Sequence, residues 1–398
     1  MKRRVLFVFV DALGPQQFKR FEGRLKDLDK HRTLDGILGY TSGALPTILT
    51  GTQPAIHGRA CLFSRCESED SLLSPLSWLG FLPRIVHERP RVRNWATNWL
   101  KKKRGLTGYV ALHKVPPALF RHLDLPERDD LFQAPEIGGA PTFLSAARKA
   151  GLNVFAAPWQ VPEKPRWELV HSELKDSDPD LSFLYASELD AILHKEGNHG
   201  EQADAAIARI SDNINRARDA LSAKGGELHT LIVGDHGMGE IHTVIDPRKM
   251  VKSMKAGRVF VDATMMRVWG DSKKLAQIAQ QIERAGWPGQ FLGQAALRQQ
   301  HFPTQGSPYG DAIFVLDEGA MFAPSFLGGA CAGMHGYTMD CASHSSIVVS
   351  DSSIPDQIKG LGDLAPHVLK LLNLESTTPQ QECMPQNQND SLLLKTAG

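Results

Sequence analysis

Short apolar runs recur along the chain and predict buried strands. They cover residues 5–10, 154–158, 183–185, 231–233 and 347–349. Runs of this length, without polar alternation, are typical of parallel strands covered on both faces. Between them, apolar residues spaced three and four apart predict helices over 201–223, around 273–285 and over 364–372. Strand-like runs that alternate with helical segments along the chain predict a three-layer α/β/α core around a mostly parallel sheet.

Two regions, at about 62–138 and about 240–330, do not follow this alternation. The first is rich in Arg, Trp, Leu and Pro, and the second has Gly-rich and aromatic stretches. We interpret both as lid insertions in a single α/β domain spanning 1–374, because loops on a rigid scaffold commonly select the substrate. Residues 375–398 are rich in Gln, Asn, Thr and Pro, which predicts a flexible tail.

Composition and charge change this picture little. Hydrophobic residues are 42% and charged residues 22% of the 398 residues, and the formal net charge is +1. These values exclude wholesale disorder and give no overall field that would attract nucleic acid. The apolar run after Arg4 ends at Asp11, too soon for a secretory signal, and no stretch is long enough to cross a membrane. With five cysteines and no CxxC pair, we expect reduced thiols and a cytoplasmic protein.

Residue types that bind metals follow the predicted strands. Asp11 follows the first strand, Asp235 and His236 follow 231–233, and Asp190 and His194 lie just beyond 183–185. Each alone is typical of a helix cap, a turn or a helix-surface pair. Together they are expected to converge, because sites form beyond the carboxyl ends of parallel strands.

His335, in a Gly-rich loop, completes a set of three aspartates and three histidines. Zinc and manganese accept such ligands, and six suffice for two ions. Two ions ~4 Å apart can hold the attacking and leaving oxygens of a phosphoryl displacement.

A segment with two adjacent hydroxyls suggests a nucleophile. Thr41 and Ser42 precede Gly43 and an apolar helical pattern, which predicts a helix N-terminus there. Backbone N–H groups at such a terminus bind phosphoryl oxygens. The alternative is an ordinary Ser/Thr helix cap.

The motifs together resemble the alkaline phosphatase superfamily, and within it the type I phosphodiesterase/nucleotide pyrophosphatase branch. They occur in the family's order: VDALG at 10–14, LTGTQPAIHG at 49–58, Asp190-x3-His194, DHGM at 235–238 and HGY at 335–337. The resemblance implies an alkaline phosphatase-like catalytic domain with two divalent metal ions, zinc or alternatively manganese.

The resemblance also implies the role of each site residue. Asp190, His194 and His335 would hold one ion. The other would be held by Asp11, Asp235 and His236 together with the nucleophile oxygen. Counting back from Gly51 places Thr41 at the nucleophile position, and a slip of one residue selects Ser42.

The implied function is a metal-dependent phosphoric ester hydrolase, a phosphodiesterase that forms a phosphoryl-threonine intermediate. Two positions depart from the family pattern. Leu62 stands where the branch has an Asn about 21 residues after the nucleophile, and no Arg follows Thr41 within the loop. The alternatives are a phosphomonoesterase or phosphomutase on the same scaffold, and a non-catalytic protein that binds phosphate ligands.

The first insertion carries a basic cluster with two tryptophans, Trp95 and Trp99. Its cationic residues are Arg84, Arg89, Arg91, Arg93, Lys101, Lys102, Lys103 and Arg104. The cluster is either a solvated face of a packed lid or an apolar and basic surface for peripheral contact with anionic lipid or a lipid-linked phosphate. We expect a phosphate-ester substrate, with a lipid- or glycan-linked one as the alternative, and no nucleic acid, because no reading module accompanies the cluster. Arg267 is interpreted as a structural salt-bridge partner or a phosphate-facing cation.

Overall fold

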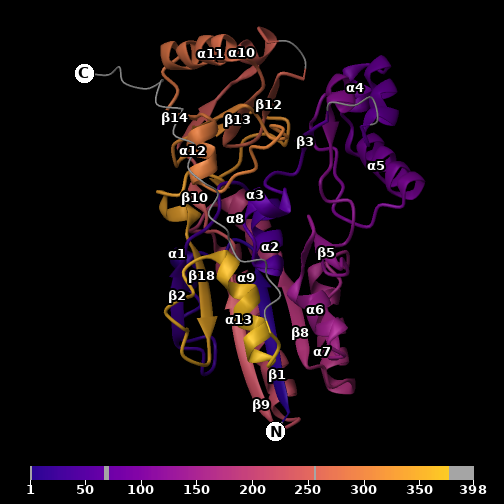
Figure 1. Cartoon of the computed structure of the whole chain (residues 1–398), viewed down its shortest axis with the longest axis vertical. Helices are drawn as coiled ribbons and strands as arrows, with labels where there is room; N and C mark the ends of the chain where they lie inside the picture. The colour runs from indigo at the N-terminus through magenta and orange to yellow at the C-terminus, as the bar shows by residue number, and fades with distance from the viewer. Residues whose placement is uncertain (1, 67–70, 255–256, 376–398) are drawn as a thin grey trace.

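The computed structural model describes residues 2–66, 71–254 and 257–375, and a mostly parallel sheet lies at its centre (Figure 1). Within these residues the sheet has six strands, in the order β2–β18–β9–β1–β8–β7. Their bounds are β1 (Arg3–Val10), β2 (Lys30–Leu34), β7 (Val154–Ala156), β8 (Leu181–Ala186), β9 (Glu227–Val233) and β18 (Ser346–Ser350). The strand pairs β1–β8, β1–β9 and β7–β8 are parallel.

Helices cover both faces of this sheet. Val5, Phe7 and Phe9 of β1 pack in one cluster with α2 (Thr41–Thr50), α6 (Phe143–Lys149) and α13 (Leu364–Leu371). The intervening residues of β1 pack on the other side against α7 (Glu163–Asp176), α8 (Glu188–Glu196) and α9 (Glu201–Ser222). Successive side chains of a strand point to opposite faces, so an unbroken apolar run fills both cores. The predicted three-layer α/β/α fold is confirmed.

The predicted helices are present as α9, α11 (Ser272–Arg284) and α13. One strand prediction was wrong in direction, because β18 runs antiparallel to both β9 and β2. His335 lies at the carboxyl end of the parallel strands, and no crossover helix separates it from β18. The chain therefore enters β18 at that end and runs back along the sheet. The edge strand β2, with the polar sequence KHRTL, gave no apolar signal and was not predicted. Except for Glu375, the predicted flexible tail lies outside the described residues.

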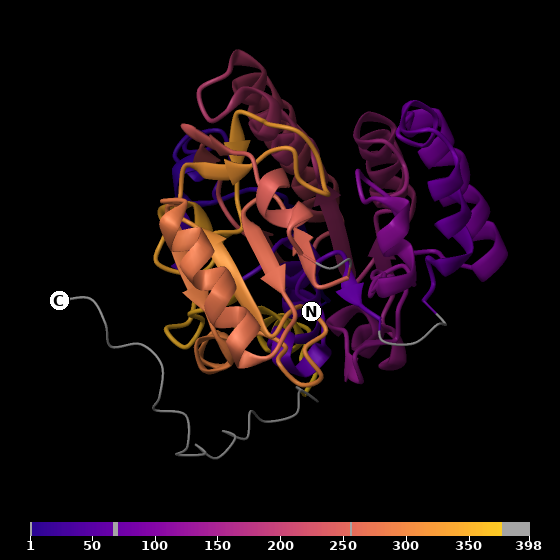
Figure 2. The same cartoon turned by 90° about the horizontal axis from the view of Figure 1, so that it is seen from above.

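The first insertion packs around an apolar cluster that it shares with Phe260 and Trp269 of the second insertion. Its own members include Phe63, Leu76, Leu100 and Phe120. Figures 1 and 2 show its helices α4 and α5 at an outer side of the molecule. The elements between β2 and β7, besides α2 and α6, are α3 (Pro54–His57), β3 (Ser64–Arg65), η1 (Ser74–Phe81), α4 (Arg84–His87), α5 (Pro90–Arg104), η2 (Pro117–His122), β4 (Leu123–Asp124), β5 (Glu136–Ile137) and β6 (Ala140–Pro141).

The second insertion forms an antiparallel four-stranded sheet, in the order β12–β13–β15–β14, with α11 packed on it. The elements here are β11 (Thr243–Ile245), α10 (Arg248–Lys252), β12 (Val259–Val261), β13 (Met265–Val268), β14 (Gly289–Leu292), α12 (Gln294–Gln299), β15 (Ala312–Leu316) and β16 (Ala320–Phe322). Its other face packs against Tyr40, next to Thr41. The insertion therefore helps to position the predicted nucleophile segment.

Arg267 holds the two insertions together from the inside. Its Nε lies 2.6 Å from Asp262 Oδ2, its Nη1 donates to the Phe63 carbonyl at 2.7 Å, and both charged side chains are fully buried. Burial raises the pKa of Asp262 even though the guanidinium opposes this shift. Arg267 is thus a structural salt-bridge partner, the first of the two interpretations.

Asp262→Ala is expected to lower the free energy of unfolding by about 3–5 kcal/mol, because it leaves the buried guanidinium of Arg267 without its anion. Urea denaturation measures this. Asp246→Ala, which breaks the exposed pair between Asp246 and Arg248, serves as the control and is expected to cost less than about 1 kcal/mol. Equal costs for the two variants would contradict the structural role of the buried pair.

His57 lies under the helix that carries Thr41. Its Nε2 is 2.9 Å from Thr47 Oγ1, its Nδ1 accepts from the Arg59 N–H, and only 2% of it is exposed. Burial lowers the pKa of His57 to about 3. The unfolded chain, with an ordinary histidine pKa near 6.5, therefore binds this proton more readily than the folded protein does.

Stability is consequently expected to be greatest above about pH 6.5 and to fall as the pH drops toward 3, with His57 contributing about 2 kcal/mol of the loss by pH 5. Urea denaturation at pH 7 and pH 5 measures the fall. His57→Gln is expected to be less stable at pH 7 but to lose less between the two pH values. A variant with the same pH dependence as the unchanged protein would show that another group is responsible.

Candidate active site

The predicted site residues lie beyond the carboxyl ends of three neighbouring strands. Asp11 directly follows β1, and Asp235 and His236 follow β9 after a single glycine. Asp190 and His194 lie one turn apart on α8, which begins just after β8. His335 follows the short strand β17 (Gly333–Met334), which pairs with β10 (Gly239–Glu240) and so lies beside the Asp235 loop.

Gly234 explains how the Asp235 loop reaches the end of β1. A Cβ atom at this position would come within 1.8 Å of the Leu13 carbonyl oxygen. Any side chain would therefore push the loop away from β1. The space beside this glycine is thus filled by the backbone of Leu13 and not by a ligand.

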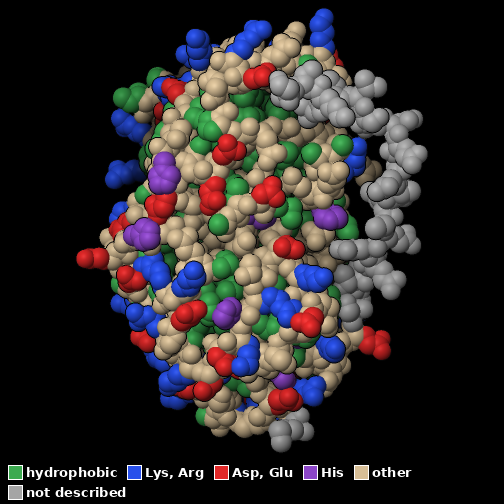
Figure 3. Space-filling model, turned by 90° about the vertical axis from the view of Figure 1, so that its left-hand side faces the viewer, with side chains coloured by type: hydrophobic (Ala, Val, Ile, Leu, Met, Phe, Trp, Pro, Cys, Tyr) green, Lys and Arg blue, Asp and Glu red, His purple; other side chains and the backbone are tan. Residues whose placement is uncertain are grey.

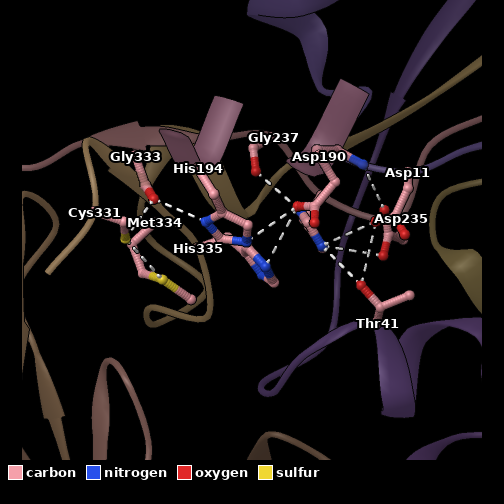
Figure 4. Close-up of polar contacts among 12 residues, drawn as sticks. Asp11, Thr41, Asp190, His194, Asp235, Gly237, Cys331, Gly333, Met334 and His335 are labelled. Atoms are coloured by element: carbon pink, nitrogen blue, oxygen red, sulfur yellow. Dashed lines mark hydrogen bonds and ion pairs between the residues drawn. The ribbon is translucent and has the colours of Figure 1, made fainter. Parts of the chain in front are cut away.

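One acid–histidine group surrounds the Thr41 hydroxyl (Figure 4). Thr41 Oγ1 lies 3.3 Å from Asp11 Oδ1 and 3.1 Å from His236 Nε2. His236 Nε2 is also 3.1 Å from Asp235 Oδ2. Candidate ligand atoms of Asp11, Asp235 and His236 all lie within 4.8 Å of one another.

Asp190, His194 and His335 form the second group, whose candidate ligand atoms also lie within 4.8 Å of one another. Asp190 Oδ1 is 3.3 Å from His194 Nε2 and 3.7 Å from His335 Nε2. The His335 ring stacks on that of His236, with centroids 3.6 Å apart. Figure 4 shows Asp190 between the two histidines of its group and the aspartates beside Thr41. The grouping is the one that the family resemblance implied.

The chemistry of these donors fits divalent cations. His236 Nδ1 lies 2.9 Å from the Gly237 carbonyl and His194 Nδ1 lies 2.8 Å from the Gly333 carbonyl. A ring whose Nδ1–H donates to a carbonyl presents a lone pair on Nε2, here toward carboxylates that also present lone pairs. Within the described residues, the buried atoms Asp190 Oδ1 and Asp235 Oδ2 have no hydrogen-bond donor. A cation in each group would satisfy these facing acceptors.

The charges in the pocket also favour bound cations. Burial raises the pKa of Asp11 well above its ordinary value, and Asp235 and Asp190 raise it further. Burial disfavours the charged form of His236, but without a cation the surrounding carboxylates outweigh burial and raise its pKa to about 10, so its Nε2 then carries a proton that a bound cation would displace. Three carboxylates thus share one buried region and repel one another, a repulsion that bound cations would remove.

Thr41 and Ser42 point in different directions at the start of α2. Thr41 is the first residue of this helix, and its hydroxyl faces Asp11 and His236. Ser42 Oγ is 3.5 Å from the Ala60 carbonyl, on another side. Tyr40 OH contacts Thr264 Oγ1 at 2.9 Å, which ties the start of α2 to the second insertion.

A cavity of about 530 Å³ opens next to these two groups, and all its lining side chains among the described residues are apolar, aromatic, small, acidic or histidine. Leu45, Leu62, Phe132 and Tyr185 line it, as do Tyr109 and Trp159, whose ring centroids are 6.2 Å apart. The cavity can therefore hold an apolar or aromatic group attached to a phosphate near Thr41.

Comparison with known families identifies the chain. Residues 99–338, more than half of it, match the type I phosphodiesterase/nucleotide pyrophosphatase family. The chain belongs to this family. It is thus a phosphoric ester hydrolase by family and fold, and divalent metal ions suit such a site. A comparison with curated proteins finds no match in sequence.

Solved structures share the fold of this phosphodiesterase-family chain. Murine ectonucleotide pyrophosphatase/phosphodiesterase 5 superposes with a TM-score of 0.63 at 15% identity, covering 94% of this chain and 96% of that chain. The human protein of that name gives 0.61 at 15% identity, covering 97% of each chain. A murine variant described as inactive, with a threonine replaced by alanine, was solved in complex with AMP and gives 0.62 at 15% identity, covering 94% of this chain and 96% of that chain.

Sequence reasoning missed Tyr185 as a member of the site. Its hydroxyl donates to Asp11 Oδ2 at 2.8 Å and so orients this carboxylate. The signal was available, because Tyr185 ends a predicted strand whose carboxyl end faces the site. Leu62, where the branch has an Asn, lines the cavity and supplies no polar atom there.

Proposed function

We propose that the chain is a phosphodiesterase in which Thr41 is the nucleophile and the two acid–histidine groups bind divalent metal ions, with zinc as the first choice and manganese as the alternative. The observation that carries this proposal is the placement of the Thr41 hydroxyl against Asp11 and His236 at the start of a helix. Thr41 is preferred to Ser42 because the hydroxyl of Ser42 faces the Ala60 carbonyl instead. A murine structural relative is described as inactive when one of its threonines is replaced by alanine, which supports a threonine nucleophile on this fold.

The reaction would proceed in two displacements. Asp11 and His236 hold the Thr41 hydroxyl in position, 3.3 and 3.1 Å away, and its proton passes to solvent, which in turn protonates the departing alcohol. Thr41 Oγ1 attacks phosphorus, the bond from phosphorus to one alcohol oxygen breaks, and a phosphoryl-threonine forms. Water then cleaves this bond and releases the phosphate monoester. Bound divalent cations would supply charge stabilisation for the phosphoryl oxygens and a lower pKa for the attacking hydroxyl.

The lining of the cavity favours diesters over monoesters. A monoester carries two negative charges, and no Lys or Arg lines the cavity in the described part of the chain. A diester carries one negative charge and has a second ester group, for which the surface around Leu62, Phe132 and Tyr185 provides an apolar site. The lining of the cavity therefore favours the phosphodiesterase over the phosphomonoesterase alternative.

The protein is expected to hydrolyse bis(p-nitrophenyl) phosphate at least about tenfold faster, by kcat/KM, than p-nitrophenyl phosphate. Initial rates with added zinc or manganese test this expectation. The opposite preference would favour the phosphomonoesterase alternative. Phosphate-ligand binding without turnover of either compound would favour the non-catalytic alternative.

A further inference from the structure

We propose that the outer side of the first insertion docks on the surface of an anionic phospholipid membrane. Four large apolar side chains gather there, and we call them the apolar edge: Trp78, Phe81, Ile85 and Trp95. Their exposed fractions are 43%, 91%, 71% and 54%. The rings of Trp78 and Trp95 contact each other, with centroids 6.3 Å apart. Contiguous exposed apolar surface of this kind is uncommon in soluble proteins unless it binds something.

Cationic side chains lie near the apolar edge along the sequence. Between residues 74 and 104 the single acidic residue is Glu88, which pairs with Arg84 at 2.6 Å. Two of the eight cations have internal roles, since Arg93 donates to the Val115 carbonyl and Lys101 to the Gly108 carbonyl. The six exposed ones are Arg84, Arg89, Arg91, Lys102, Lys103 and Arg104. The exposed part of the cluster is therefore strongly basic, as either sequence interpretation of it requires.

The helix α5 places charge and apolar surface on one side. Arg91, Trp95 and Lys102 are four and seven residues apart, so they lie along the same side of the helix. Ala96 and Leu100, which are buried, face the insertion's own core. Trp95 therefore points away from the protein with a cation on either side of it along the helix.

An anionic membrane fits this surface better than a nucleic acid does. Apolar side chains enter the boundary between headgroups and acyl chains, while Lys and Arg attract anionic headgroups. Single-stranded nucleic acid is bound by ring stacking in basic grooves, and Ile85, with 71% exposed, has no ring to stack. No helix in the described residues is long and apolar enough to span a bilayer, so the contact would be peripheral. On the side of the molecule away from α4 and α5, acidic and basic side chains are interspersed (Figure 3).

The test is co-sedimentation with vesicles of phosphatidylcholine alone and of phosphatidylcholine with phosphatidylglycerol in equal parts. The full chain is expected to bind the anionic vesicles and to bind the zwitterionic ones at least about tenfold more weakly. The double variant Phe81→Ser, Ile85→Ser and the double variant Arg91→Glu, Lys102→Glu are each expected to bind anionic vesicles at least about tenfold more weakly. Both should keep the unchanged circular dichroism spectrum and the basal turnover of a soluble diester.

The matched control is Leu169→Ser with Val244→Ser, which removes exposed apolar side chains (41% and 53%) outside the first insertion. It is expected to bind like the unchanged chain. The proposal is overturned if the unchanged chain does not bind anionic vesicles, or if the control loses as much binding as the edge variants. Binding of a single-stranded oligonucleotide without vesicle binding would assign the surface to nucleic acid instead.

Discussion

Thr41→Ala is expected to lower kcat for a phosphodiester by about 10⁴-fold or more, because it removes the oxygen that would form the phosphoryl-threonine. The remaining rate would come from binding and charge stabilisation alone. Steady-state kinetics measures the loss. The fold should survive, since Thr41 is the first residue of α2 and is only partly buried, and unfolding curves check this.

Two neighbouring variants sharpen the test of the nucleophile. Thr41→Ser keeps an oxygen at the same position and should retain far more turnover than Thr41→Ala. Ser42→Ala removes the hydroxyl that faces the Ala60 carbonyl and should lose far less. A larger loss in Ser42→Ala than in Thr41→Ala would assign the nucleophile to Ser42. Trapping of a phosphorylated residue in acid-quenched enzyme would identify it independently.

Removal of divalent metals by a chelator is expected to abolish turnover and to lower the unfolding midpoint. Zinc or manganese, added back at about one hundred times its dissociation constant, should return about 2.7 kcal/mol of stability per site. Metal analysis of the dialysed protein is expected to find two ions per chain. Full activity in a protein shown to be free of metal would contradict the two-metal proposal.

The variant Asp11→Asn tests whether Asp11 is a metal ligand or a purely structural residue. Asp11 is buried, and Asp235 and Asp190 add to the rise of its pKa. In metal-free protein, the neutral amide relieves this repulsion, so the variant should unfold at a higher temperature than the unchanged chain. With zinc or manganese present the order should reverse, because the variant loses a ligand. His229→Gln, which breaks a His–acid pair with Glu227 away from the site, should show no such reversal.

The sequence was sufficient for the core elements because their apolar positions carry a strong signal. The run from Val5 to Val10 is buried on both faces, and the spacing of apolar residues in α9 fits one buried side of a helix. The direction of β18 could not be predicted, because a short buried strand has the same composition whichever way it runs. The edge strand β2 is largely exposed, so its residues carry no apolar pattern.

The internal structure of the insertions, in contrast, could not be predicted from the sequence. The strands of the second insertion's four-stranded sheet are short and are interrupted by turns and glycines, so the sequence showed no regular apolar pattern there. The contact of this insertion with Tyr40 joins residues more than two hundred positions apart. The role of Arg267 likewise depended on Asp262 and on the Phe63 carbonyl, which belong to different insertions. Local sequence contains no information on such partners.

By itself, the sequence determined the α/β/α class and the six acidic and imidazole residues of the site, because each of these follows from a local pattern or a family motif. Only the tertiary structure decided that Thr41, and not Ser42, faces Asp11 and His236, that Tyr185 holds Asp11, and that Trp78 and Trp95 meet on an exposed surface. These features depend on the direction in which a side chain points. That direction is set by how helices and loops distant in sequence pack together, so it cannot be read from neighbouring residues.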